Sequence, residues 1–220
     1  MNGQTVGVLG LGGSGVAAVA ALRAAGAHVV AFDDGKYQQD LPAIQMTDWR
    51  DWPWQDMAAM VISPGIPHLH PKPHPAAAHA NSLQIDVISE VELALRAKPK
   101  AQLVVVTGTN GKSTTTALIG HCLATAGRAH AIGGNLGEPA CSLDDPGKDG
   151  VLILELSSYQ LETTPSLAPD ISILLNISPD HLDRLGADCL AIIGDGDEHV
   201  KALAAATRKR GIKTIIASPD

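Results

Sequence analysis

Cysteine, basic charge, aromatic residues and long apolar runs are all scarce in this sequence of 220 residues. Its three cysteines are widely spaced, which predicts neither a disulfide framework nor a metal knuckle and favours a reducing cytoplasm; they are Cys122, Cys141 and Cys189. The net charge of -7 argues against a nucleic-acid partner, because phosphate neutralisation needs a concentrated basic face. No apolar run approaches the roughly 18 residues of a membrane span, and no export signal precedes the first strand. We expect a cytoplasmic protein, and a monomer.

The residues that are abundant predict an α/β fold. Hydrophobic residues make up 45% of the chain and glycine occurs 22 times, which suits alanine- and valine-rich helices and strands. Strand-like and helix-like segments alternate, as in mainly parallel sheets covered by helices. The polar stretch "AKPKAQ" predicts a boundary near Pro99, with one domain over residues 1–98 and a second over 99–220.

The first domain also contains two segments whose local structure can be predicted from capping residues and prolines. A helix over residues 88–96 should begin with a capping box formed by Ser89 and Glu92. The proline-rich segment 67–80 is typical of an irregular surface loop. Its histidines do not favour a metal site, because prolines interleave with them and no cysteine or acidic residue lies close in the sequence; they are His68, His70, His74 and His79.

The remaining elements follow from runs of apolar residues bounded by glycine, proline or polar residues. The expected strands are 5–10, 28–32, 58–63, 103–108, 130–134, 151–156, 171–177, 189–194 and 213–218, and the other expected helices are 14–25, 112–126 and 200–210.

A glycine motif, "GLGGSG", follows the first strand and opens the first long helix. Gly10, Gly12 and Gly15 give the G-x-G-x-x-G spacing that allows a tight turn and lets a diphosphate approach the helix N-terminus. Asp33 and Asp34 end the next strand, where an acidic residue can accept hydrogen bonds from a ribose hydroxyl. The alternative is that these glycines only permit close strand-to-helix packing.

A second glycine-rich loop, "TGTNGKST", is two residues shorter than the common phosphate loop. It follows an apolar strand and leads into a helix, so its backbone N–H groups and the helix dipole should converge on an anion. Lys112 can neutralise outer phosphates, and Ser113 or Thr114 can ligate magnesium. The alternative is a glycine-rich turn with an incidental lysine.

Polar side chains follow two other apolar strands of the second domain. Glu155 ends the strand "VLILE", which should bring its carboxylate to the sheet edge where the phosphate loop lies, so it could complete a magnesium shell. After the strand at 171–177, the segment "NISPDHLDR" could bind a second divalent ion, orient a phosphate, or simply form a capped polar turn. Its candidate residues are Asn176, Asp180, His181 and Asp183.

Six motifs together resemble the Mur ligases, in the same order and at similar spacing over residues 5–186: "GLGGSG", "SPGIP", "TGTNGKST", "GGNLG", "LELSSYQLE" and "DHLDR". The similarity is greatest to the branch of that family that adds D-glutamate to UDP-N-acetylmuramoyl-L-alanine in peptidoglycan synthesis. The ATP loop of the family has this shortened form. The resemblance implies a Rossmann-like N-terminal domain that binds the UDP part of the substrate, and a P-loop-type central domain that binds ATP and Mg²⁺.

The resemblance also implies roles for individual residues. Those implied at the UDP substrate are Gly13, Ser14, Asp33, Ser63, Gly65, Asn135, Gln160 and His181. Those implied at the ATP phosphates are Gly108, Thr109, Asn110, Gly111, Lys112, Ser113 and Thr114. Lys112, Glu155 and His181 would be catalytic, and Ser113, Glu155 and His181 would hold the metal. The segment "AFDDG" departs from the family pattern, which leaves uridine contacts through Asp34 and Gly35 open.

The reaction implied by the resemblance has two steps: the substrate carboxylate attacks the γ-phosphate of ATP, and D-glutamate then attacks the acyl phosphate. This chain departs from the family after "DHLDR", where a helix carrying a carbamylated lysine is expected but a strand follows; Lys201 is an unsuitable replacement. It also covers only about the first half of such an enzyme. We therefore expect substrate binding with little ligation by this chain alone. The alternatives are a non-catalytic nucleotide-binding fragment and a nicotinamide-dependent oxidoreductase.

Overall fold

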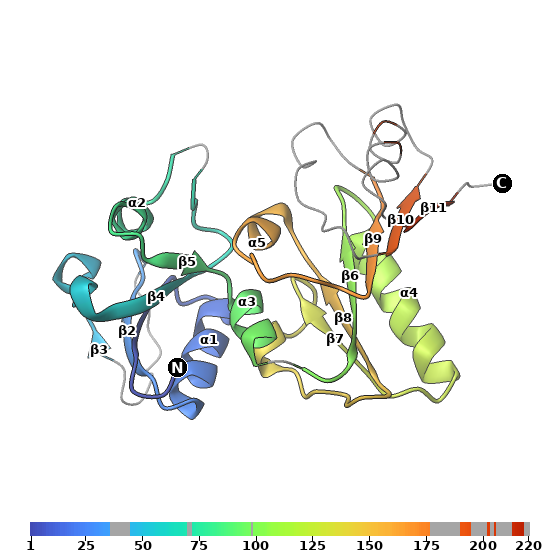
Figure 1. The fold of residues 1–220 in the computed structure, drawn as a ribbon, viewed down its shortest axis with the longest axis horizontal. Coiled ribbons are helices and arrows are strands. Elements are labelled where there is room, and N and C mark those ends of the chain that lie inside the picture. The colour runs from blue at the N-terminus through green and yellow to red at the C-terminus, as the bar shows by residue number, and fades with distance from the viewer. Residues whose placement is uncertain are drawn as a thin grey trace. The chain divides into compact units, whose positions relative to one another are not determined.

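The computed structural model describes residues 1–35, 45–69, 72–97, 99–176, 190–194, 202, 205 and 213–217 (Figure 1). The chain divides into two compact units, each considered by itself below. The first contains Met1–Ala97 together with Thr163–Pro165, and the second contains Lys98–Glu162 and Ser166–Asp220. None of the helices among the described residues is long and apolar enough to cross a membrane.

The first unit contains a five-stranded, parallel sheet in the order β3-β2-β1-β4-β5. The strands are β1 (Thr5–Leu9), β2 (His28–Phe32), β3 (Gln45–Met46), β4 (Met57–Ile62) and β5 (Asp86–Ile88), and the helices are α1 (Gly13–Ala24), α2 (Pro75–Ser82) and α3 (Glu90–Arg96), with short 3-10 turns η1 (Trp49–Asp51) and η2 (Trp54–Asp56). Since β1 lies between β2 and β4, the chain reverses its direction of winding there. The carboxyl ends of these three strands meet at the point where α/β sheets hold ligands.

The core of the first unit concentrates the scarce aromatic residues. Trp52 and Trp54 are buried with Leu9, Met60 and other apolar side chains. Their indole N–H groups donate to backbone oxygens, Trp52 to Thr47 and Trp54 to Trp49, so burial leaves no indole donor unpaired. The third tryptophan of the chain, Trp49, also belongs to this unit.

The prediction that segment 67–80 is wholly irregular was wrong, because α2 begins at Pro75. Proline is well suited to the first helical turn, which needs no N–H there, and the Nδ1 atom of His74 accepts a hydrogen bond from Ala76 N to cap the helix. Ala76, Ala77 and Ala80 are strong helix formers and are fully buried against the sheet. The last proline of the segment, Pro75, is the first residue of α2, so none of these prolines interrupts the helix.

The predicted N-cap of α3 is confirmed, but the capping box is not complete. Ser89 Oγ accepts a hydrogen bond from Glu92 N at 3.0 Å, as expected. Ser89 N, which a carboxylate at the third position would bond in a full box, donates to Thr163 O at 2.7 Å, and Glu92 Oε1 accepts from Arg96 Nε at 2.8 Å. A backbone carbonyl distant in sequence has taken the place of the local carboxylate.

The second unit contains a six-stranded parallel sheet in the order β11-β10-β9-β6-β8-β7. The strands are β6 (Gln102–Thr107), β7 (His130–Gly134), β8 (Val151–Glu155), β9 (Ile171–Leu174), β10 (Leu190–Gly194) and β11 (Lys213–Ala217), and the helical segments are α4 (Lys112–Thr125), α5 (Ser158–Glu162) and η3 (Ala140–Ser142). The core joins Val104 and Val106 of β6 to Val151 and Ile153 of β8, and α4 packs on β6, β7 and β8.

The six strands of the second unit lie where the sequence predicted strands. Helix α5 was not predicted. The expected helix over 200–210 lies outside the described residues, except for two positions within it. Neither Cys122 nor Cys141 forms a disulfide in the described part of the chain, whereas Cys189 lies outside it.

Candidate functional site

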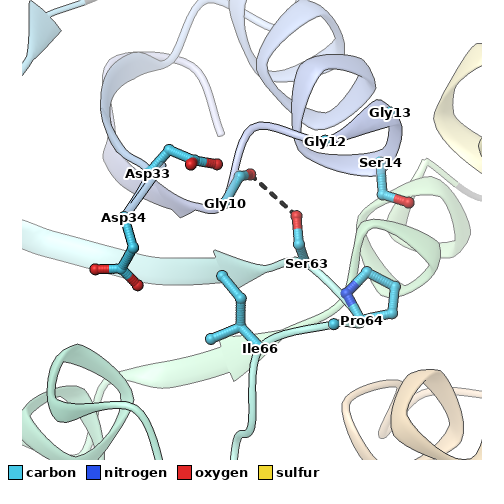
Figure 2. A pocket seen from close by; sticks show the side chains of 10 residues that line it. Gly10, Gly12, Gly13, Ser14, Asp33, Asp34, Ser63, Pro64 and Ile66 are labelled. Atoms are coloured by element: carbon cyan, nitrogen blue, oxygen red, sulfur yellow. Dashed lines mark hydrogen bonds between the residues drawn. The ribbon is translucent and has the colours of Figure 1, made fainter. Parts of the chain in front are cut away.

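The glycine turn after β1 forms one wall of a cavity of about 460 Å³ in the first unit (Figure 2). Gly10 has φ +89, a conformation that favours glycine, and a Cβ on Gly15 would lie 1.9 Å from Gly10 O. These two glycines bring the start of α1 against the turn, so its first N–H groups face the cavity region. The lining residues are Gly10, Gly12, Gly13, Ser14, Asp33, Asp34, Ser63, Pro64, Gly65 and Ile66.

Five residues predicted at the UDP substrate are brought together in this cavity: Gly13, Ser14, Asp33, Ser63 and Gly65. Two of them also hold the glycine turn. Ser63 Oγ donates to Gly10 O at 3.0 Å, the bond drawn in Figure 2, and Asp33 Oδ2 accepts from Leu11 N at 2.6 Å. The cavity wall is therefore fixed by hydrogen bonds between the turn after β1 and the residues that directly follow β2 and β4.

In the second unit, the side chain of Lys112 folds back over the short phosphate loop from which it extends. Gly108 and Gly111 have φ +137 and +84, so the glycines allow the loop to turn without strain. Lys112 Nζ donates to Gly108 O at 2.7 Å and to Thr109 O at 3.1 Å. The ammonium thus lies over the loop at the N-terminus of α4, where the helix dipole adds to its positive charge.

A smaller cavity, of about 210 Å³, adjoins this loop. The ends of β6 and β9 and the segment after β8 enclose it, so it lies at the switch point of the second sheet. Its lining residues are Thr107, Gly108, Thr109, Lys112, Ser157, Ser158, Tyr159, Leu161, Leu174 and Asn176.

Asn176 holds the phosphate loop, a role that the sequence did not reveal. Its Oδ1 accepts from Asn110 N at 2.8 Å, its Nδ2 donates to Asn110 O at 2.9 Å, and its backbone oxygen accepts from Thr109 N at 2.9 Å. The only signal in the sequence is an amide side chain directly after a strand. The other candidates from that segment, Asp180, His181 and Asp183, lie outside the described residues, so the catalytic, metal and substrate roles of His181 stay predictions.

Glu155 is buried at the end of β8, with 2% of its surface exposed. The register pairs it with Val106, so it lies at the same sheet edge as the loop that carries Lys112. Its Oε1 accepts from Asn135 Nδ2 at 3.0 Å, whereas its buried Oε2 has no hydrogen-bond partner in the described part of the chain. A buried carboxylate oxygen without a donor fits a divalent cation, because hard cations prefer such oxygens.

The other described residues predicted at the substrate or the metal line neither of the two cavities. Asn135 is held against Glu155 by its side chain and by its backbone N–H, which donates to Glu155 O at 2.8 Å. Gln160 is buried, and its Oε1 accepts from Ser157 N and Ser157 Oγ, which fixes the start of α5. Ser113 and Thr114 are exposed on the first turn of α4 and do not line the smaller cavity.

Two parallel sheets, each with a glycine turn and a helix N-terminus at its switch point, place the chain among α/β proteins of the kind in which such turns can receive phosphate groups. Residues 106–193 match the family described as the Mur ligase middle domain. Over the length that it spans, the chain belongs to the Mur ligase family, as its six motifs predicted.

The curated relatives narrow the similarity to one branch of that family. UDP-N-acetylmuramoylalanine–D-glutamate ligase of Nitrobacter hamburgensis is 47% identical over 193 residues, which cover 84% of this chain and 41% of the relative. The protein of the same name from Paramagnetospirillum magneticum is 43% identical over 240 residues, which cover 100% of this chain and 52% of the relative. The chain thus spans about half the length, or less, of these relatives.

Solved structures confirm the α/β fold. The murein peptide ligase of Psychrobacter arcticus 273-4 has a TM-score of 0.56 at 16% identity, covering 98% of this chain and 53% of that one. UDP-N-acetylmuramate:L-alanyl-gamma-D-glutamyl-meso-diaminopimelate ligase of Neisseria meningitides has a TM-score of 0.57 at 15% identity, covering 98% of this chain and 78% of that one. At such identities these matches establish the fold alone.

Proposed function

We propose that this chain supplies the substrate- and ATP-binding units of a cytoplasmic ligase that adds D-glutamate to UDP-N-acetylmuramoyl-L-alanine. The names of its relatives at 47% and 43% identity support the reaction. The observation that carries the proposal is the placement of Lys112 and the buried Glu155 at one edge of the second sheet. A lysine and a carboxylate oxygen without a donor are what a metal-bound triphosphate requires.

In the second unit, the loop and its lysine would hold the terminal phosphates of ATP. The Lys112 ammonium now bonds two loop carbonyls, Gly108 O and Thr109 O, and it can exchange these for phosphate oxygens by rotation of its side chain. Asn176 keeps the loop in shape during that exchange. Glu155 Oε2 would hold Mg²⁺, with Asn135 fixing the other carboxylate oxygen. When bound, Mg²⁺ offsets the negative charge that gathers where the substrate carboxylate meets the γ-phosphate.

In the first unit, the turn after β1 would hold the diphosphate of the UDP substrate. The lining residues include no lysine or arginine among the described ones, so binding would depend on backbone N–H groups at the start of α1 and on the Ser14 hydroxyl. Ser63 keeps the Gly10 carbonyl, which would repel phosphate, engaged as an acceptor. The nucleoside would then extend toward the end of β2, where Asp33 and Asp34 lie.

We further propose that these 220 residues bind both ligands but turn over little by themselves. The alignment with the Paramagnetospirillum magneticum relative runs over 240 residues, more than the chain contains, so that relative carries residues within the aligned region that this chain lacks. An alignment longer than the chain is what loss of the helix expected after "DHLDR" would produce. The D-glutamate site and the second metal would require groups beyond those described above.

Calorimetry tests the proposal with two titrations, one of UDP-N-acetylmuramoyl-L-alanine and one of ATP with magnesium. We expect both to bind, and the Lys112→Met variant to lose at least about tenfold in ATP affinity while keeping its affinity for the UDP substrate. Lys148→Met is the matched control, because Lys148 is an exposed lysine of the same unit outside the cavity. Normal ligase turnover would contradict the claim of an incomplete site, and enhanced NADH fluorescence on mixing would favour the nicotinamide alternative.

A further inference from the structure

The acidic residue expected to meet the nucleoside, Asp33, already uses both of its carboxylate oxygens within the protein. Oδ2 accepts from Leu11 N at 2.6 Å and Oδ1 accepts from Gly35 N at 2.8 Å. Figure 2 shows this carboxylate turned toward the glycine turn. A carboxylate that holds two backbone N–H groups is a structural support of the turn, and its capacity for a ligand is reduced.

Asp34, the next residue, is placed differently. It also lines the cavity, and Figure 2 shows its carboxylate turned away from the glycine turn. Its side chain is 62% exposed, and its Oδ2 lies 3.0 Å from His74 Nε2. None of the described residues bonds Oδ1. Among the described residues, Asp34 Oδ1 is therefore a carboxylate oxygen of this cavity that can accept a hydrogen bond from a ligand without giving up a bond to the backbone.

His74 fixes the direction of that carboxylate. Its Nδ1 accepts from Ala76 N at 3.1 Å as the cap of α2, so in the neutral ring the proton is on Nε2, which donates to Asp34 Oδ2. The imidazole is itself held, since its side chain is only 12% exposed and packs edge-on against Trp49 at 6.2 Å between ring centroids. Both ring nitrogens are thus in use, and the start of α2 is coupled to the rim of the cavity.

We propose that Asp34 is the specificity-determining residue of the nucleoside half of this cavity, and that His74 is its positioning residue. Resting on the proposed binding of a UDP substrate, the inference assigns Asp34 Oδ1 as the acceptor for a donor on the nucleoside, either a ribose hydroxyl or the N3–H of uracil. Asp33 instead supports the glycine turn. The phosphate end and the nucleoside end of the ligand are then recognised by opposite chemistry, N–H donors at one end and a carboxylate acceptor at the other.

The test is calorimetry of the full chain with UDP, 2′-deoxy-UDP, 3′-deoxy-UDP and N3-methyl-UDP. For the unaltered chain, the analogue that lacks the bonded donor should bind at least about tenfold more weakly than UDP. Asp34→Asn, whose amide oxygen can still accept from His74, should weaken UDP binding to a similar extent and bring the affinity ratio of that analogue to UDP close to one. Asp51→Asn is the control, because Asp51 is an exposed acidic residue of the same unit outside the cavity.

His74→Asn separates the two roles of the imidazole. Asparagine is a good helix cap, so α2 should stay folded, but its shorter side chain should not hold Asp34. We expect weaker discrimination between UDP and the critical analogue at an unfolding midpoint close to that of the unaltered chain. Unchanged discrimination in His74→Asn would overturn the positioning role. Unchanged discrimination in Asp34→Asn would overturn the assignment of Asp34 while leaving the proposed function intact, whereas failure of the unaltered chain to bind UDP would overturn both.

Discussion

The tight contact between α1 and the turn after β1 predicts that a single methyl group will disrupt the first unit. In Gly15→Ala, the new Cβ would lie 1.9 Å from Gly10 O and 3.2 Å from Ser63 Oγ, whereas real Cβ contacts essentially never fall below 3.0 Å. Neither neighbour can yield easily. Gly10 N donates to Phe32 O at 2.8 Å, and Gly10 O accepts from Ser63 Oγ at 3.0 Å.

The cost follows from what must move. Helix α1 has to separate from the turn, although Ala18 and Leu22 on the same helix are fully buried. Overpacking of this kind costs about 1–3 kcal/mol, and the fixed turn places Gly15→Ala in the upper part of that range, at least about 2 kcal/mol. For a unit of this size, that corresponds to a fall in the unfolding midpoint of at least about 8 °C.

Tryptophan fluorescence measures this effect selectively, because all three tryptophans lie in the first unit. Gly13→Ala is the matched control, since a Cβ at Gly13 meets nothing within 4 Å and its φ is not in the left-handed region. That variant should be neutral or stabilised by up to about 1 kcal/mol through its effect on the unfolded chain. If Gly15→Ala melts at the same temperature as Gly13→Ala, the close packing of α1 on the turn is refuted.

Three further predictions concern other parts of the chain. Ser89→Ala removes the cap of α3 and a bond to Thr164 Oγ1 at 2.7 Å, so urea titration should show a loss of about 1–2 kcal/mol that Ser89→Thr partly restores. Hydrogen bonds from backbone N–H groups, that of Lys100 first, lower the pKa of Asp145; the carboxylate therefore stabilises the fold above the ordinary aspartate pKa, and this contribution is lost as the pH falls through the lowered value. The difference in thermal stability between Asp145→Asn and the unaltered chain should accordingly be present at neutral pH and vanish in acid. Glu155→Gln should remove the magnesium dependence of ATP affinity, so titrations with and without magnesium should become similar; a retained dependence would exclude Glu155 as a ligand.

The local parts of this fold could be predicted because short sequence intervals determine them. Each glycine turn lies between an apolar strand and a helix start that adjoin it in the sequence, and the positive φ of Gly10 and Gly111 is what such turns require. The placement of Glu155 at the sheet edge follows from the same reasoning, since parallel strands present their carboxyl ends at one edge, but its burial was not predicted. Propensity and periodicity alone were sufficient for these elements.

The contacts that distinguish the sites were not predictable, because they join residues far apart in the chain. Asp34 meets His74 across 40 positions, and Asn110 meets Asn176 across 66. Two neighbouring aspartates look equivalent in sequence, and only the backbone donors that reach Asp33 separate its role from that of Asp34. The helix after the prolines was missed for a similar reason, since its alanines become informative once they are seen to be buried under the sheet.

The two cavities share one architecture and differ in the charge of their linings, and this difference supports the ligand proposed for each. The first is lined by Asp33 and Asp34 and by no described cationic side chain, so it would favour a ligand rich in hydroxyl and N–H donors over one that carries a triphosphate. The second includes Lys112 beside the loop, with Glu155 at the same sheet edge, so the charges of terminal phosphates and of a divalent cation would both be offset there. The proposed pairing, a nucleotide sugar in the first unit and a metal-bound triphosphate in the second, would place the greater negative charge beside Lys112 and the hydroxyl and N–H donors beside Asp33 and Asp34.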